Sequence, residues 1–295
     1  MKPVSFIPTG ALRPLLFFVA TLFACLSAEA KVHLKISATA QIAESFAKWT
    51  AEMPVDQITS YKNTNANRPT VDLILELQAL KAGGLDFDYE IITAPNNARA
   101  RLEVIQANAD ITAETTWDFL IDPEEKNLLR TTPIILDGEF EKGVYVLPTN
   151  EKILKVKSLE ELQQFTGIVV NSWEIDVRTL RAMQPKGLEL PSKSENVYAM
   201  LAKERADFTL LELSSQPDLS NESNGVRLIP IPGVKIALKG GSRSWIVAKG
   251  SPNAEAIHAA LVKGVKKFRD EGRITRAFKE CGFFNPRAAD WKRLF

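Results

Sequence analysis

The chain has 295 residues, with 37 Lys and Arg against 36 Asp and Glu and a formal net charge of +1. A balance this close to neutrality excludes a general binding surface for nucleic acid or anionic membranes. With 45% hydrophobic residues, the chain is long enough for two lobes that each bury a core of their own.

The first thirty residues are predicted to be an export signal and not part of the fold. Lys2 and Arg13 make the start basic, residues 15–26 form an apolar core, and residues 28–30 are a small-x-small cleavage site. The apolar core of about 12 residues is shorter than the ~20 that span a bilayer, so we expect a cleaved signal and a periplasmic protein. The less favoured alternative is a lipoprotein attached through Cys25.

Cleavage would leave Cys281 as the single cysteine of the mature chain. No disulfide within the chain is then expected, despite the oxidising compartment. We predict that Cys281 is a small buried apolar residue and not a reactive thiol.

Strands and helices are expected to alternate along the first half of the chain. Periodicity predicts strands at residues 31–37, 87–93 and 110–117, a buried helix at residues 71–82, and a shorter helix after residue 97. This order predicts a parallel sheet with right-handed crossovers. In such sheets ligands lie beyond the carboxyl ends of the strands.

Two stretches of the first half give finer signals. Between residues 38 and 69, apolar side chains at Ile42, Phe46 and Trp49 indicate a helical turn or two, followed by a polar loop. In the helix after residue 97, the expected buried face consists of Ala98, Leu102 and Ile105.

A second alternating unit follows in the middle of the chain. Strands are expected at residues 143–147, 167–172 and 206–213. Helix starts are predicted at two capping boxes, residues 158–161 and 192–195, and at Asp176 as a helix cap.

Residues 244–284 are expected to form a strand, a turn and two helices. Ser251 and Pro252 stand where an N-cap and a first helical residue belong. Gly272 breaks the first helix, and Gly282 sits just past the end of the second, where a left-handed residue is easiest for glycine.

This order of elements resembles the C-terminal part of the type II periplasmic solute-binding proteins, also called solute-binding protein family 3. Residues 105–111 (IQANADI) look like that family's helix end and following strand, and residues 205–212 (RADFTLLE) look like its "R-x-D-A-x-x-x-D" strand. The resemblance covers most of the mature chain. It implies an α/β fold of two lobes, each a mostly parallel sheet flanked by helices, joined by two hinge strands. Lobe 1 would comprise residues 31–145 and 246–295, and lobe 2 residues 146–245.

The resemblance also implies a ligand site between the lobes, carried over one position at a time. Glu212 falls on the family's amino-group-binding aspartate, and Asn97 falls where many members have a stacking aromatic. The implied ligand-binding residues are Asn97, Thr115, Thr116, Trp117, Asn171, Ser172, Trp173, Asp176 and Glu212.

The family's carboxylate-clamping arginine has no counterpart by position. Depending on the direction of counting, it falls on Asp122 or Glu124, with Glu125 beside them. A carboxylate there would repel another carboxylate, so an ordinary amino-acid clamp is not expected.

Two ligand chemistries stay open. If Trp117 and Trp173 face each other across the cleft, with acidic side chains nearby, the site suits a cation or a hydroxyl-rich ligand. The acidic side chains are Glu114, Glu174 and Glu212. The alternative is an anion site supplied by Arg99, Arg101 and Arg178.

Motifs for catalysis are missing from the sequence. It lacks G-x-S-x-G and H-E-x-x-H, and its two histidines, His33 and His258, stand far apart, so neither hydrolysis nor a metal site is expected. No cofactor and no nucleic-acid partner are expected.

The function expected is an exported, monomeric solute-binding protein that closes on a small polar solute without catalysis. Its partner would be an ABC permease or, as the less favoured choice, a membrane sensor. The alternatives are a ligand-sensing or protein-interaction module on the same fold and an exported enzyme that uses this scaffold.

Overall fold

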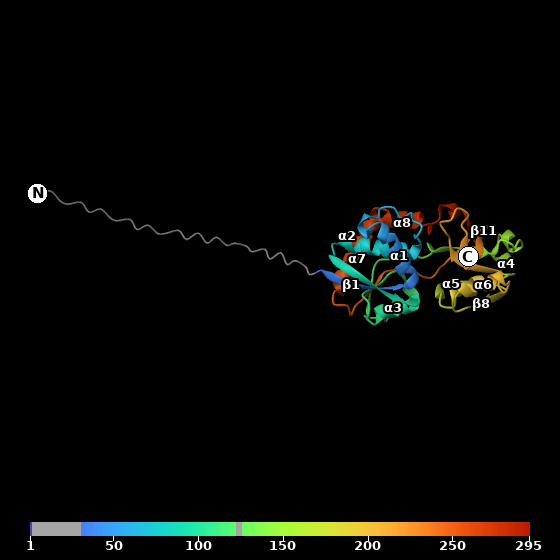
Figure 1. Ribbon diagram of the computed structural model, residues 1–295, viewed down its shortest axis with the longest axis horizontal. Helices are drawn as coiled ribbons and strands as arrows, with labels where there is room; N and C mark the ends of the chain where they lie inside the picture. Colours follow the sequence, from blue (N-terminus) through green and yellow to red (C-terminus); the bar gives the residue numbers. More distant parts are fainter. Residues whose placement is uncertain (2–30, 122–125) are drawn as a thin grey trace. The chain divides into compact units, whose positions relative to one another are not determined.

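The computed structural model describes Met1, residues 31–121 and residues 126–295 (Figure 1). The predicted export signal, with Cys25, lies outside the described residues, and so do Asp122, Glu124 and Glu125. Residues 31–295 group into one unit and are described by themselves. In the described part of the chain, no helix combines the length and apolar character needed to cross a membrane.

The first sheet has five strands in the order β2-β1-β3-β13-β5. Strand β1 is parallel to β2 and β3, whereas β13 is antiparallel to β3 and β5. The strands are β1 (Val32–Thr39), β2 (Phe87–Ala94), β3 (Ile111–Thr112), β5 (Leu128–Arg130) and β13 (Ile246–Ala248).

Helices cover both faces of this sheet. Val104 of α3 clusters with Ile246 and Ala248 of β13, whereas Val247, between them, belongs to the larger core built with the other helices. Alternate residues of a strand point to opposite faces, so α3 lies opposite the larger core. The helices are α1 (Ala40–Glu52), α2 (Arg68–Gly83), α3 (Asn97–Ile105), α7 (Ala254–Asp270) and α8 (Arg273–Glu280).

The second sheet follows the order β10-β11-β6-β9-β7-β8, and β14 pairs with β11. Its β7 is parallel to β8 and β9, while β6 is antiparallel to β9 and β11. The strands are β6 (Glu141–Val146), β7 (Thr166–Ile168), β8 (Gly187–Glu189), β9 (Phe208–Glu212), β10 (Asn221–Ser223), β11 (Val226–Ala237) and β14 (Lys292–Arg293). The helices in this part of the chain are α4 (Leu159–Leu162), α5 (Glu174–Met183) and α6 (Ser194–Ala202).

Helices lie against both sheets, which confirms the predicted α/β fold class. Each sheet pairs its strands in both directions, so the prediction that each would be mostly parallel is wrong. The chain passes from the first sheet to the second between β5 and β6 and returns between β11 and β13. A short ladder pairs β4 (Thr116–Trp117), which lies between β3 and β5, with β12 (Arg243–Ser244), which lies on the returning connection. The sheet pairings place all of β6, and also β14, in the second sheet, whereas the sequence assigned residues 141–145 and 292–293 to lobe 1.

The backbones of α2 and α7, two helices of the first sheet's larger core, are in close contact. An added Cβ at Gly264 of α7 would lie 2.0 Å from the carbonyl oxygen of Ala79, and one at Gly83 of α2 would lie 2.1 Å from that of Ala260. Because neither glycine carries a side chain, α2 and α7 approach more closely than larger residues would permit. The predicted helix at residues 71–82 is confirmed as buried, and Gly84 ends it in the left-handed conformation.

Two predicted helix starts are wrong and a third is confirmed. The α7 helix begins at Ala254 after Asn253, and the Ser251 hydroxyl donates to Asp110 Oδ1 instead of capping the helix. The α6 helix begins at Ser194 without a side-chain cap, so the capping box at residues 192–195 is wrong. The box at residues 158–161 does cap: Ser158 Oγ accepts from the Glu161 amide at 3.3 Å.

Two further predictions fail for local reasons. The strand expected at residues 110–117 breaks into β3 and β4, because the chain bends between them and Thr112 Oγ1 donates to the Glu114 carbonyl at 2.8 Å. In α3 the buried residues are Ala100 and Val104, so the predicted face is wrong by part of a turn. Gly272 and Gly282 have φ of 65° and 87°, as expected of helix-breaking glycines.

Candidate functional site

The first charged group between the two sheets is Arg68, the first residue of α2. Asn67 caps this helix by accepting from the Thr70 amide at 3.0 Å, which fixes where the arginine side chain starts. The guanidinium is buried and makes three ion pairs. Nη1 lies 2.9 Å from Asp72 Oδ2, Nη2 3.1 Å from Glu114 Oε2, and Nε 3.0 Å from Glu212 Oε1.

Glu212 is the last residue of β9, so Arg68 joins a helix of the first sheet to a strand of the second. Its side chain is 29% exposed, against 5% for that of Arg68. One face of the Glu212 carboxylate is therefore still accessible to a ligand.

A second buried arginine, Arg243 of β12, shares these carboxylates. Its Nε donates to Thr115 Oγ1 at 2.9 Å, its Nη2 donates to the Thr115 carbonyl, and Nη2 lies 3.5 Å from Glu114 Oε2. The Thr115 amide and hydroxyl both donate to Asp72 Oδ2, at 3.1 and 2.8 Å. Thr115 therefore links Arg243 to Asp72, which is a partner of Arg68, and Glu114 pairs with both arginines directly.

The third cation is Lys142 of β6, which pairs with Asp176 at 2.6 Å. Both side chains are buried, and the Lys142 ammonium lies 5.0 Å from the centre of the Trp173 ring. Asp176 lies in the first turn of α5 and not at its cap, which corrects the prediction that it caps the helix. Its carboxylate is used by Lys142 instead.

The Phe140 ring is surrounded by all three cations. The distances to its centroid are 5.3 Å from Arg68 Cζ, 5.6 Å from Arg243 Cζ and 5.8 Å from Lys142 Nζ. Trp117 also contacts it, with ring centroids 5.1 Å apart. The negative face of an aromatic ring attracts cations, so this phenylalanine helps to hold the three charges together.

Burial and mutual charge shift the pKa values of these groups. Burial disfavours the charged form of Arg68, but its three carboxylates outweigh burial and raise the pKa of the guanidinium. For Arg243, burial and the neighbouring Arg68 charge lower the pKa to about 10. Burial also raises the pKa of Asp72 and of Asp176, although each has a cationic partner.

The structure brings together some of the residues that the sequence predicted and not others. The charged network consists of Arg68, Asp72, Glu114, Thr115, Lys142, Asp176, Glu212 and Arg243. Of the predicted residues, Thr115, Asp176 and Glu212 belong to it, and Trp117 and Trp173 lie against its cations. Thr116 is buried in the β4–β12 ladder opposite Ser244. The three asparagine and serine positions, Asn97, Asn171 and Ser172, are exposed.

The two tryptophans have different environments. Trp117 is 6% exposed and packs on Phe140 and Phe119, so it is a packing residue. Trp173 is partly exposed and lies over Lys142. No ring contact joins the two tryptophans among the described residues. Instead of facing each other, Trp117 contacts Phe140, and Lys142 lies over both Phe140 and Trp173.

Four members of the network escaped sequence reasoning: Arg68, Asp72, Lys142 and Arg243. A signal for two of them existed, since Arg68 and Asp72 stand one turn apart at the start of a helix with a long apolar run. Charged residues on a fully buried helix need partners, and that requirement points to a buried site. Lys142 and Arg243 gave no such signal, because they lie in strands whose partners are distant in sequence.

Arginines that the sequence proposed for an anion site take other roles. Arg101 of α3 lies 3.8 Å from Glu174 of α5, and Arg178 of α5 lies 4.6 Å from the Phe119 ring. Both contacts also join residues of the two sheets. Arg99 pairs with Glu103 on its own helix at 2.6 Å.

The described residues hold no cluster of three or more His, Cys, Asp or Glu side chains arranged for a metal ion. Cys281 is buried, as predicted, and burial raises the pKa of its thiol to about 12. His258 Nε2 lies 2.8 Å from the Arg130 carbonyl, and His33 pairs with Asp88 on the surface.

Comparison with known proteins gives a match in structure only. No family model matches the chain, and no curated protein matches it in sequence. The structure of ytmK from Bacillus subtilis, a probable amino-acid ABC transporter extracellular-binding protein, superposes with a TM-score of 0.56 at 14% identity. That match covers 85% of this chain and 97% of the other.

Two further structures are similar. The VFT2 domain of the periplasmic part of Bordetella pertussis BvgS has a TM-score of 0.54 at 12% identity, over 84% of this chain and 92% of the domain. The GluR0 ligand-binding core from Nostoc punctiforme, in complex with L-glutamate, has a TM-score of 0.50 at 13% identity, over 86% and 100%. These matches confirm the predicted resemblance to type II periplasmic solute-binding proteins at the level of the fold, with its two lobes.

Proposed function

We propose that the chain is an exported solute-binding protein, which closes its two lobes on a small polar solute and delivers it to an ABC permease. The observation that carries this proposal is the ion pair between Arg68 and Glu212, because it places charged groups of both sheets at one point. Contacts made by both lobes exist only when the lobes are closed, so a ligand that adds such contacts shifts the equilibrium toward closure.

The accessible groups at this point favour a cationic or hydroxyl-rich solute. Within residues 31–121 and 126–295, Glu212 Oε2 accepts no hydrogen bond, and the Glu174 side chain is 46% exposed. Trp173 offers a partly exposed ring beside them. Rings stack on sugars or attract cations, and carboxylates bind hydroxyl and ammonium donors. The buried cations are already paired with carboxylates of the protein, so they would bind an anionic solute less strongly.

A panel of solutes tests the proposal by thermal shift on the exported protein, purified after expression of the full chain. Amines, amino sugars, sugars and amino acids are added singly, and a solute specific for the folded state raises Tm; at 100 times Kd the gain is about 2.7 kcal/mol. We expect a hit among the amines or sugars. Tight binding of an unmodified acidic amino acid would overturn the ligand class.

Variants then locate the site. Trp173→Ala and Glu212→Gln should each remove the thermal shift, since they delete the ring and the free carboxylate oxygen. Glu222→Gln is the matched control, because Glu222 is exposed on β10 of the same sheet. Binding that survives both site variants would place the solute elsewhere.

A second candidate is a sensing or protein-interaction module. The observation in its favour is that Arg68 and Glu212, side chains of the protein itself, join the two halves. If no solute in the panel shifts Tm, and small-angle scattering shows one compact form that Arg68→Gln opens, this candidate replaces transport.

A further inference from the structure

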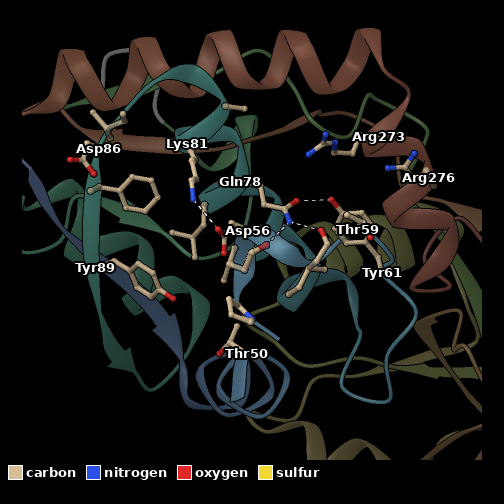
Figure 2. Close-up of a pocket in the computed structure, with 17 residues that line it drawn as sticks. Thr50, Asp56, Thr59, Tyr61, Gln78, Lys81, Asp86, Tyr89, Arg273 and Arg276 are labelled. Carbon is tan, nitrogen blue, oxygen red and sulfur yellow. Dashed lines mark hydrogen bonds and ion pairs between the residues drawn. The ribbon is translucent and has the colours of Figure 1, made fainter. Parts of the chain in front are cut away.

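A groove beside the first sheet lies apart from the charged network. It encloses about 900 Å³ between the C-terminal end of α1, the loop at residues 54–61, α2, β2 and the first turn of α8 (Figure 2). None of the charged-network residues lines it. Pockets for small molecules hold about 300–1,000 Å³, so the groove has the volume of a ligand site.

The wall at residues 54–61 is fixed in place by Gln78. Its side-chain amide donates to the carbonyls of Val55 and Ile58, at 2.7 and 2.8 Å, and its oxygen accepts from the Tyr61 hydroxyl at 2.7 Å. Gln78 and Tyr61 are both buried. The groove is therefore bounded by a segment that its hydrogen bonds hold in one conformation.

Apolar side chains make up much of the lining. Tyr89, at 37% exposed, is among the few exposed large apolar residues of the described chain, and its ring packs edge-on to Phe46 at 6.1 Å. The apolar lining includes Val55, Ile58, Leu77, Leu85, Phe87 and Tyr89. Such a lining binds the apolar part of a ligand.

One end of the groove is cationic. Figure 2 shows Arg273 and Arg276 together at that end, near Thr59 and Tyr61. They stand three residues apart on α8 and so share a helix face. Both charges act on Tyr61: burial raises the pKa of its hydroxyl to about 12, and the two guanidinium groups oppose that rise.

These two arginines have hydrogen-bonding capacity to spare. In the described ranges, Arg276 is exposed and makes no ion pair, and the buried Nε of Arg273 has no acceptor. Arg273 does pair with Glu271 at 3.0 Å and lies over the Phe268 ring. The other cation of the groove, Lys81, is neutralised by Asp56 at 3.0 Å, and Asp86 lies exposed at the rim away from the arginines.

We propose that this groove is a second binding site, and that it takes a small amphipathic carboxylate. The carboxylate would accept from Arg276 and from Arg273, which lines the groove with a side chain that is 30% exposed, and the apolar body would lie on Leu77, Phe87 and Tyr89. A guanidinium is well suited to a carboxylate because its donors match the two oxygens.

Three probes with one apolar body and different head groups test the proposal: octanoate, octan-1-ol and octylammonium. Each is titrated by calorimetry into the exported protein, purified after expression of the full chain. We expect octanoate to bind at least tenfold more tightly than either of the others. Equal binding of octanoate and octan-1-ol, or no binding of octanoate, would overturn the proposal.

Variants on α8 identify the head-group contact. Arg276→Gln should weaken octanoate binding about tenfold and leave octan-1-ol unchanged, since only the carboxylate loses a charge-assisted hydrogen bond. Arg276→Lys should retain part of the affinity. Lys279→Gln is the matched control, because Lys279 is exposed on the same helix and does not line the groove.

Trp173→Ala, a variant beside the charged network, distinguishes the groove from the site between the two sheets. Octanoate binding should be the same in Trp173→Ala as in the unchanged protein. Loss of octanoate binding in Trp173→Ala, with Arg276→Gln unaffected, would place the carboxylate between the sheets and overturn the second site.

Discussion

Arg68 Nε lies 3.0 Å from Glu212 Oε1, so the first residue of α2 is ion-paired with the last residue of β9. The two residues are 144 positions apart in sequence and belong to elements of different sheets. The same guanidinium also holds Asp72 and Glu114. One side chain thus makes ion pairs with three carboxylates and connects the two halves of the molecule.

Removal of this arginine should be costly to stability. Arg68→Gln leaves Asp72 and Glu114 buried with too little positive charge, and we expect the free energy of unfolding to fall by about 3–5 kcal/mol. Glu212→Gln should cost about 1 kcal/mol or less, because the Glu212 side chain is 29% exposed. Urea denaturation of both variants measures the difference. Equal, small losses would show that the buried carboxylates do not depend on Arg68.

The ion pair of Lys142 with Asp176 is a second buried pair, 2.6 Å long. We expect Lys142→Met to cost about 3–5 kcal/mol, since it leaves a buried carboxylate alone, and the double variant with Asp176→Asn to recover part of that loss. A double-mutant cycle by chemical denaturation measures the coupling. The exposed pair of Lys48 and Glu44 is the control, and its coupling should be far smaller because solvent screens it. Additive effects at Lys142 and Asp176 would contradict the assignment.

Glycine at position 264 should be required by helix packing. A Gly→Ala change in a helix normally stabilises by up to about 1 kcal/mol, but a Cβ at Gly264 would meet the Ala79 carbonyl oxygen at 2.0 Å. We therefore expect Gly264→Ala to lower Tm by several degrees, because α2 and α7 must move apart.

A matched substitution tests the sign of this effect. Gly84 has a φ of 99° with open space around its Cβ position, so Gly84→Asn should change Tm far less. A stabilised Gly264→Ala protein would mean that the two helices are not in such close contact.

Glu76 should make stability depend on pH. This residue of α2 is fully buried, neither of its carboxyl oxygens has a partner among the described residues, and burial raises its pKa well above the ordinary 4.5. The folded chain then keeps a proton that the unfolded chain releases, so stability falls as pH rises from about 4.5 toward the raised pKa.

The variant Glu76→Gln removes this titration. Its Tm relative to the unchanged protein should rise between about pH 4 and pH 8, since only the unchanged protein carries the Glu76 titration and loses its contribution over that interval. Glu151→Gln, at an exposed position, is the control and should follow the unchanged protein at every pH. A constant difference for Glu76→Gln across the interval would contradict the buried, protonated carboxyl.

The local sequence determined the elements and much of their burial. The all-round apolar run at residues 71–82 became the buried helix α2, and Gly272 and Gly282 broke the helices where the sequence placed them. The order of strands and helices was sufficient for the resemblance and for the fold class, since periodicity and breakers act within a few residues.

Local reasoning failed where a side chain had a distant partner. Ser251 and Asp176 looked like helix caps, but Asp110 and Lys142 use their polar groups instead. A sequence pattern shows that a residue is able to cap a helix. It does not show which long-range partner competes for the same atom.

The charged network was decided by the tertiary structure alone. Arg68, Lys142, Glu212 and Arg243 lie on four separate elements, and only the crossing of the chain between two sheets brings them around Phe140. Burial of charge is unfavourable unless partners are present, so these residues depend on one another for their positions. The sequence fixes which residues are charged, and the topology determines which of them meet.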